Sequence, residues 1–446
     1  MVAKHEGAAG ELLRILGIGF GLAVVVGGVV GQGIMRTPGI VAGAMPNEAW
    51  NLAAWTLGGL IILADACGTV ELGASIPRAG GPYVFAHRAF GPFAGTMLGW
   101  ADWLNYTLAI SFVSVVFAEY AQRLGLATSL PLGALAVLLI AVVTLINWSG
   151  TKASGASQVA GSAIKGLGLL LLVALLWIIP GHAPVASPAA APAPVFGLAA
   201  FAVAMRAIAI TYGGWSSCVY FCEEVHRPER SVVRATFGGI LLVMLLYLLV
   251  NASILHVLTR EQIAASKLPV ADAMAAVLGP ASGSVITILA IISVVAICNL
   301  QVMTAPRIAY AMARNGVLPS VLTRVSASGT PRVALLCTTL VAALLASTGG
   351  YERLIAMGAP FLIGVAAVSD LAAITMRFKE PELERPFKMP LFPLPAVVGF
   401  TVNALLIGAI FYDDPIDTSL GVGLLVAIGI ATKVHAHLRL QRPAAV

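Results

Sequence analysis

The stretch GGVVGQGIMRTPG, residues 27–39, decides the fold because it interrupts a long apolar segment near its middle. Glycine in a helix interior costs about 1 kcal/mol relative to alanine, so Gly31-Gln32-Gly33 favours a break in the helix. Non-helical backbone at membrane depth is tolerated only where it is buried in protein or lines a cavity. Close helix packing is the alternative for each glycine, and we favour it for the three glycines between residues 17 and 21.

The composition around this stretch is that of a chain embedded in lipid. Of the 446 residues, 59% are hydrophobic and 10% are charged, and the mean hydropathy is +0.94. Soluble proteins carry about 25% charged residues, so most of this surface must face lipid. A hydrocarbon core of about 30 Å needs about 20 apolar residues per helix. The sequence predicts twelve spans, near 14–43, 51–75, 91–120, 131–148, 156–179, 196–223, 234–257, 283–312, 333–348, 353–376, 391–412 and 418–436.

The basic residues predict the orientation. With the amino terminus inside, 19 Lys and Arg fall on the cytoplasmic side and 5 outside, while Lys165 and Arg206 lie within spans. The positive-inside rule therefore places both termini in the cytoplasm, for an integral protein of the plasma (bacterial inner) membrane. The net charge of +6 does not indicate a nucleic-acid partner, because the basic residues lie in short loops. We expect no cleaved signal peptide, and a flexible connector at 180–195.

A second candidate break lies in the sixth predicted span, at 211–214, directly before Trp215. Breaks five spans apart suggest two inverted repeats of five helices that meet at the bilayer midplane. The expected organisation is one transmembrane domain, 1–446. In it, repeat 1 covers about 14–179, repeat 2 about 196–376 and two extra helices about 391–436.

The two breaks would expose backbone groups suited to a zwitterion. A half-helix starting near Ile34 offers free N–H groups and a positive dipole end, which suit a carboxylate. Half-helices ending near Val26 and Ile210 would offer free carbonyls, which suit an ammonium group. Together these groups would bind the carboxylate and the ammonium group of an α-amino acid. The expected substrate-binding residues are Val30, Gly31, Gln32, Gly33, Ile34, Ile210, Thr211, Tyr212, Gly213, Gly214 and Trp215, although Tyr212 and Trp215 could simply pack as aromatics do.

Seven motifs, taken in order and spacing, carry a resemblance to a known family. They are VGQGIMRTPG (30–39), ELGASIPRAGGPYVF (71–85), FGPFAGTMLGW (90–100), TYGGW (211–215), EEVHRPERSVVRA (223–235), PRIAYAMARNGVLP (306–319) and RPFKMPLFPLP (385–395). With them the chain resembles the amino acid–polyamine–organocation permeases nearly end to end. The resemblance implies an all-α LeuT-type fold with substrate held between spans one and six. Gln32, where the family usually has Ser or Thr, and Ile210, where it often has Phe, depart from the pattern.

Lys165 lies about ten residues into the fifth span, near mid-depth at 1.5 Å per residue. A lysine there costs roughly 2.5–3.5 kcal/mol, so it needs a partner or a purpose. We expect its ammonium to contact carbonyls near Gly27 and to brace the broken helix, or to carry a coupling proton. The resemblance implies that a lysine here stands where sodium sits in sodium-coupled relatives.

Other charged residues receive more modest expectations. Glu223 and Glu224, beside Arg227 and Arg230, are expected to form a cytoplasmic charge cluster at an inward gate. Arg36 and Arg206 either line an electropositive approach for carboxylates or reach toward lipid headgroups. Helix bracing or capping is expected of Asp65, Glu71 and Asp102.

The sequence argues against several other classes of protein. No HExxH zinc motif and no G-x-x-x-x-G-K-[ST] phosphate loop occurs, so we expect no enzyme, no metal and no cofactor. The loop after the third span, QRLGLATSLP, has no cysteine, so no disulfide-linked heavy chain is expected. The prediction is a sodium-independent carrier of neutral amino acids, working by proton symport or by exchange. A polyamine or cationic amino acid permease, a channel and a non-transporting amino acid sensor are the alternatives.

Overall fold

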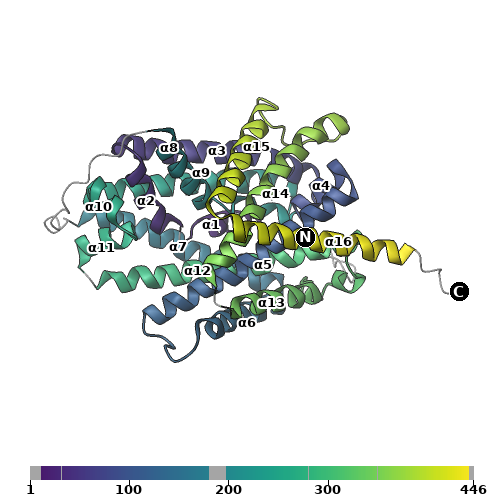
Figure 1. Cartoon of the computed structure of the whole chain (residues 1–446), viewed down its shortest axis with the longest axis horizontal. Helices are drawn as coiled ribbons and strands as arrows, with labels where there is room; N and C mark the ends of the chain where they lie inside the picture. The colour runs from purple at the N-terminus through teal and green to yellow at the C-terminus, as the bar shows by residue number, and fades with distance from the viewer. Residues whose placement is uncertain (1–11, 32, 180–196, 280, 349, 441–446) are drawn as a thin grey trace, which may run out of the picture.

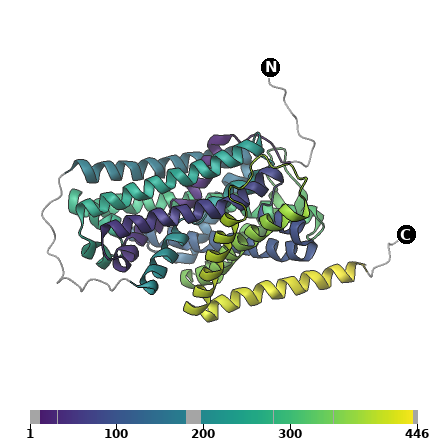
Figure 2. The ribbon, with the colours of Figure 1, turned by 90° about the horizontal axis from the view of Figure 1, so that it is seen from above.

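The computed structural model describes residues 12–31, 33–179, 197–279, 281–348 and 350–440. The expected connector at 180–195 and the side chain of Gln32 lie outside this part of the chain. Within it the chain forms helices and no β-strand, with one isolated parallel bridge between Leu16 and Val225. Most long helices run side by side in one bundle, and α16 lies at its edge (Figures 1 and 2).

The elements follow one another as expected of a polytopic membrane protein. In chain order they are α1 (Ile18–Val29), α2 (Gly33–Ala44), α3 (Glu48–Ser75), α4 (Pro82–Phe90), α5 (Pro92–Arg123), α6 (Leu132–Ser149), α7 (Thr151–Ile178), α8 (Leu198–Thr211), η1 (Trp215–Phe221), α9 (Pro228–Val257), α10 (Arg260–Ala265), α11 (Pro269–Leu278), α12 (Ser282–Arg314), η2 (Ser320–Thr323), α13 (Arg332–Ser347), α14 (Tyr351–Lys379), α15 (Leu394–Asp413) and α16 (Pro415–Leu440).

The all-helical membrane fold predicted from the sequence is confirmed. In the described residues, 10 helices are long and apolar enough to cross a membrane, or up to 11 if the bent pair α1 and α2 counts as one span. The remaining predicted span corresponds to α13, an apolar helix of 16 residues. The count of twelve, and the inverted repeat, stay predictions.

Several helix starts lie outside the predicted spans, for a simple reason. α7 begins at Thr151 and α9 at Pro228, because their polar first turns do not contribute to an apolar segment. Proline at the first position of α9 and of α5 has the backbone angle that a helix start needs. The short α4, α10 and α11 were not predicted, because hydropathy over a membrane-length window does not detect helices of 6 to 10 residues.

The packing places the broken first span inside the bundle. α1 contacts α7, α9, α12 and η1, and α2 contacts α8 and α10. α5 and α12 lie against each other, and 78% of the most apolar window of α5 is buried, against 17% for α16. The bundle is therefore built around α1, α5 and α12, with α16 outside.

Candidate functional site

α1 ends at Val29 and α2 begins at Gly33, and the two helices are bent by 50° relative to each other. We call residues 30–32 the α1–α2 break. Val30 has an extended backbone, with φ −70° and ψ 105°, so the helix does not continue through it.

The expected position of the free carbonyls was wrong. α1 continues to Val29, and the carbonyl of Val26 accepts the N–H of Val30 at 2.9 Å. The carbonyl of Ile210 likewise accepts the N–H of Gly213 at 3.1 Å. The glycine pair 27–28 lies within α1, and neighbouring side chains and backbone occupy the space that a Cβ at either residue would need.

Donors from two other helices hold the carbonyls at the end of α1. The ammonium of Lys165, on α7, donates to the carbonyl of Gly27 at 2.5 Å and to that of Val30 at 2.6 Å. The hydroxyl of Tyr247, on α9, donates to the carbonyl of Val29 at 2.9 Å. Lys165 is completely buried, and no carboxylate of the described residues forms an ion pair with it. Tyr247 escaped the sequence reasoning because a tyrosine in an apolar run carries no particular signal.

The second predicted break is a turn between α8 and η1. α8 ends at Thr211, and residues 212–214, which we call the α8–η1 turn, lead into the 3₁₀ helix η1. Gly214 has φ +99°, a backbone conformation that favours glycine. A Cβ on Gly214 would lie 2.6 Å from the carbonyl oxygen of Gly28, and one on Gly28 would lie 2.7 Å from that of Gly214. The turn and α1 therefore meet backbone to backbone.

The start of α2 completes this meeting point. A Cβ on Gly33 would lie 2.9 Å from the Thr211 methyl group. The hydroxyls of Thr37 and Thr211 share a hydrogen bond of 2.6 Å. The first N–H groups of a helix have no acceptor within the helix, so α2 brings unused donors to this point. Ile297, on α12, contacts the break from another side, because a Cβ on Gly31 would lie 2.7 Å from its Cδ1.

Most of the predicted substrate-binding residues are buried. Val30, Ile34, Tyr212 and Trp215 are at most 5% exposed, whereas Ile210 is 49% exposed. Tyr212 packs with Trp55 and Tyr247, and its hydroxyl has no hydrogen-bond partner among the described residues. The meeting point is closed in this structure.

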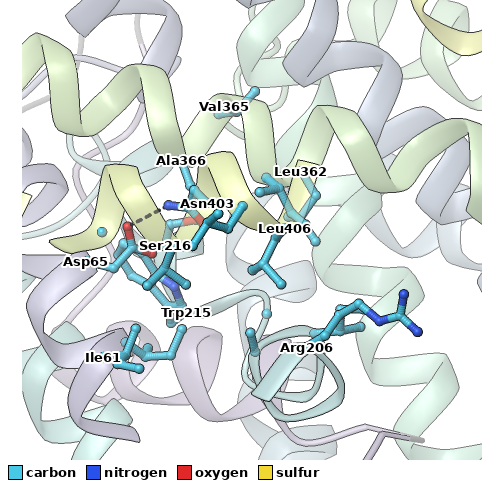
Figure 3. A pocket seen from close by; sticks show the side chains of 18 of the residues that line it. Ile61, Asp65, Arg206, Trp215, Ser216, Leu362, Val365, Ala366, Asn403 and Leu406 are labelled. Carbon is cyan, nitrogen blue, oxygen red and sulfur yellow. Dashed lines mark hydrogen bonds between the residues drawn. The ribbon is translucent and has the colours of Figure 1, made fainter. Parts of the chain in front are cut away.

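A cavity of about 450 Å³ lies beside the α8–η1 turn (Figure 3). The predicted residues that line it are Ile210, Gly213, Gly214 and Trp215. Val30, Gly31, Gly33, Ile34, Thr211 and Tyr212 are not among its lining residues. The cavity thus adjoins one side of the predicted site, the side of the turn.

Polar groups on the cavity wall come from four other helices. They are Asp65 and Thr69 on α3, Asp102, Asn105 and Tyr106 on α5, Ser369 on α14, and Asn403 on α15. Both oxygens of Asp102 accept the Tyr220 hydroxyl at 2.9 Å. Arg206, at the other side of the cavity in Figure 3, forms an ion pair with Asp413, a partner that sequence reasoning missed.

The predicted charge cluster has other partners than expected. Glu224 is fully buried and pairs with Arg307 at 2.5 and 2.6 Å. Glu223 pairs with Arg314 at 2.7 Å. Arg227 and Arg230 are exposed and form no ion pair with any described residue. The expectation that Glu223 and Glu224 pair with Arg227 and Arg230, their neighbours in sequence, was wrong. Arg227 has φ +50°, and the chain turns there into α9.

Comparison with known proteins now decides the family. The family described as amino acid permease matches residues 21–432. The chain belongs to the amino acid permease family. The permease is similar to the serine/threonine exchanger SteT of Bacillus subtilis (strain 168), with 26% identity over 94% of this chain and 95% of that protein.

Two animal relatives are similar over almost as much of the chain. The large neutral amino acids transporter small subunit 2 of Mus musculus is 27% identical over 95% of this chain and 81% of its own length. The Asc-type amino acid transporter 1 of Homo sapiens is 26% identical over 94% and 81%. The family and these relatives make the permease an amino acid transporter of the membrane, and not an enzyme.

Proposed function

We propose that the permease moves neutral amino acids by alternating access and without sodium, holding the substrate between the α1–α2 break and the α8–η1 turn. The contact of Lys165 with the carbonyls of Gly27 and Val30 carries this proposal. It places the ammonium group of Lys165 at the broken helix, where a bound cation would otherwise satisfy these carbonyls. The named relatives, an exchanger of serine and threonine and a transporter of large neutral amino acids, support a neutral substrate.

The substrate carboxylate would meet the amino-terminal end of α2, at Gly33 and Ile34, where free N–H groups and the helix dipole favour an anion. The ammonium group would meet backbone carbonyls of the turn. The carbonyls of Val26 and Ile210 are already hydrogen-bonded, so they are not our candidates. Gly28 and Gly214 touch in this structure, so binding requires the two segments to part. Alternating access supplies such a motion.

Uptake of one amino acid by the permease would be coupled either to the exit of another, by exchange, or to a proton, by symport. Exchange is favoured by the name of the bacterial relative.

We further propose that both termini are cytoplasmic, that the membrane is the bacterial inner membrane, and that no heavy chain is attached through a disulfide.

Counterflow of radiolabelled amino acids in proteoliposomes tests the proposal. We expect labelled serine, threonine or leucine to accumulate against an internal unlabelled pool, equally in sodium and in choline buffers. Binding without counterflow would indicate a sensor, and preference for lysine or a polyamine would indicate a cationic permease. Either result would overturn the proposal.

The variant Lys165→Ala tests the site itself. It removes the donor from two carbonyls, and leaving a buried polar group without a partner costs about 1–3 kcal/mol. We expect purified protein with much reduced counterflow, or with a new dependence on sodium. Lys152→Ala, at the exposed start of the same helix, is the matched control and should transport normally. Full uptake by Lys165→Ala with an unchanged pH dependence would contradict the role of this lysine.

A further inference from the structure

Two buried carboxyl groups meet where α3, α14 and α15 pack together. Asp370, on α14, is completely buried and Asp65, on α3, is 5% exposed. Both face Gly399 of α15, because a Cβ there would lie 2.6 Å from Asp370 Oδ2 and 2.8 Å from Asp65 Oδ1. The two carboxyl groups therefore converge on one point inside the membrane-spanning bundle.

Among the residues that the structure describes, the pair has one hydrogen-bond donor for its four oxygens. The amide of Asn403 donates to Asp65 at 3.0 Å. Neither oxygen of Asp370 has a hydrogen-bond partner among the described residues. A buried carboxylate with no donor is strongly disfavoured, so this side chain needs an explanation that the family membership does not supply.

No residue of the described part of the chain forms an ion pair with Asp65 or Asp370. Many of the charged and titratable groups on the packed elements have other partners: Arg377 and Arg385 with Glu71, Arg88 with Glu380, Lys379 with the carbonyls of Arg88 and Ala89, Arg206 with Asp413, Arg353 with Asp417, Asp102 with Tyr220, Tyr247 with Val29, Cys67 with Leu63, and Lys433 over the ring of Phe93. The described residues hold no group of three His, Cys, Asp or Glu side chains that could bind a metal ion.

A bound proton would remove the electrostatic repulsion between the carboxyl groups of Asp65 and Asp370. Two carboxylates this close cannot both stay ionised, because like charges repel and burial removes their hydration. A charge within the membrane is costly unless it is paired. With one proton bound, one carboxyl group donates to the other, and the pair carries a single negative charge that the amide of Asn403 stabilises.

We propose that Asp65 and Asp370 form a proton-binding site, in which one shared proton exchanges with water through the cavity beside the α8–η1 turn. Asp65 and Asn403 line this cavity together with Gly214 and Trp215, and Figure 3 shows Asp65 bonded to Asn403 near Trp215. Loss of the proton adds a negative charge to the wall next to the proposed substrate site. The site is separate from Lys165 and does not depend on how the substrate is coupled.

Infrared spectroscopy of the full-length protein in liposomes tests the site without any transport measurement. The C=O stretch of a protonated carboxyl group is recorded while the pH of the buffer is changed. We expect the wild type to show such a band at neutral pH and to lose it as the pH is raised. In Asp370→Asn the new amide donates to Asp65, so the remaining carboxylate can stay ionised and this band should be lost. Asp65→Asn should lose it as well, which keeps the test valid if one variant does not fold.

Asp102→Asn is the matched control, because it removes the other buried carboxyl group of the same cavity wall and leaves the pair intact. It should keep the band that the pair contributes. The proposal is overturned if the wild type lacks the band, if both Asp65→Asn and Asp370→Asn keep it unchanged, or if sodium ions abolish it at neutral pH, which would indicate a cation site. A transport-inactive protein that still shows the band would refute the proposed function alone.

Discussion

At the scale of single residues, Gly214 shows why the two breaks are possible. It combines a left-handed backbone, φ +99°, with a backbone contact to Gly28. Any side chain at position 214 would collide with the carbonyl group of Gly28. The left-handed backbone would also cost free energy for any residue other than glycine. The contact leaves the ends of two membrane segments close enough to share one small ligand.

Gly214→Ala is expected to abolish counterflow and to lower the free energy of unfolding. The left-handed conformation alone costs about 1–3 kcal/mol for a residue with a side chain. Thermal unfolding and counterflow of the purified variant measure both effects. Gly364→Ala, on α14, is the control, since a Cβ there meets nothing within 4 Å. Normal transport by Gly214→Ala would show that the contact between the breaks is dispensable.

At the scale of elements, Glu224 joins four segments at the predicted cytoplasmic end. It accepts from Arg307 on α12 and, at 3.3 Å, from Thr151 at the start of α7. Its own carbonyl accepts the N–H of Leu16, just before α1, at 2.8 Å. Opening the permease toward this side must separate at least some of these segments, so Glu224 is our candidate for a gate residue.

Arg307→Ala is expected to weaken this end of the bundle, because it leaves Glu224 buried without its cationic partner. Breaking a buried ion pair in this way costs about 3–5 kcal/mol. We expect a lower unfolding temperature, and faster labelling of a reporter cysteine introduced at Thr151. Arg230→Ala removes an exposed arginine of the same region and should leave both measurements unchanged. Equal effects of the two variants would argue against a gate at Glu224.

At the scale of the whole molecule, the ion pairs agree with the predicted grouping of the loops at two ends of the bundle, while which end is cytoplasmic stays a prediction. The arginines of the pairs Arg88–Glu380, Arg307–Glu224, Arg314–Glu223 and Arg377–Glu71 are among the 19 basic residues assigned to the cytoplasmic side. Arg353–Asp417 joins residues assigned to the outside. No ion pair of the described residues joins a residue assigned to one side to a residue assigned to the other.

Epitope tags on both termini are expected to be cleaved by an added protease only in inside-out membrane vesicles. The reason is the excess of 19 basic residues over 5 on the side that carries the termini. Right-side-out vesicles provide the control, because their tags should stay intact. Cleavage of either tag in right-side-out vesicles would reverse the orientation or make the number of spans odd.

The sequence by itself determined the membrane class and the helical fold, and it predicted the two helix interruptions, because hydropathy and glycine content act locally along the chain. The sequence also indicated that Lys165 has a partner or a functional role, since an isolated charge in an apolar span is costly. Only the tertiary structure decided which groups meet. Glu224 pairs with Arg307 rather than with the nearby Arg230, and Asp65 faces Asp370, which lies on a helix far away in the sequence. Such contacts depend on how distant helices pack, and no local pattern encodes that.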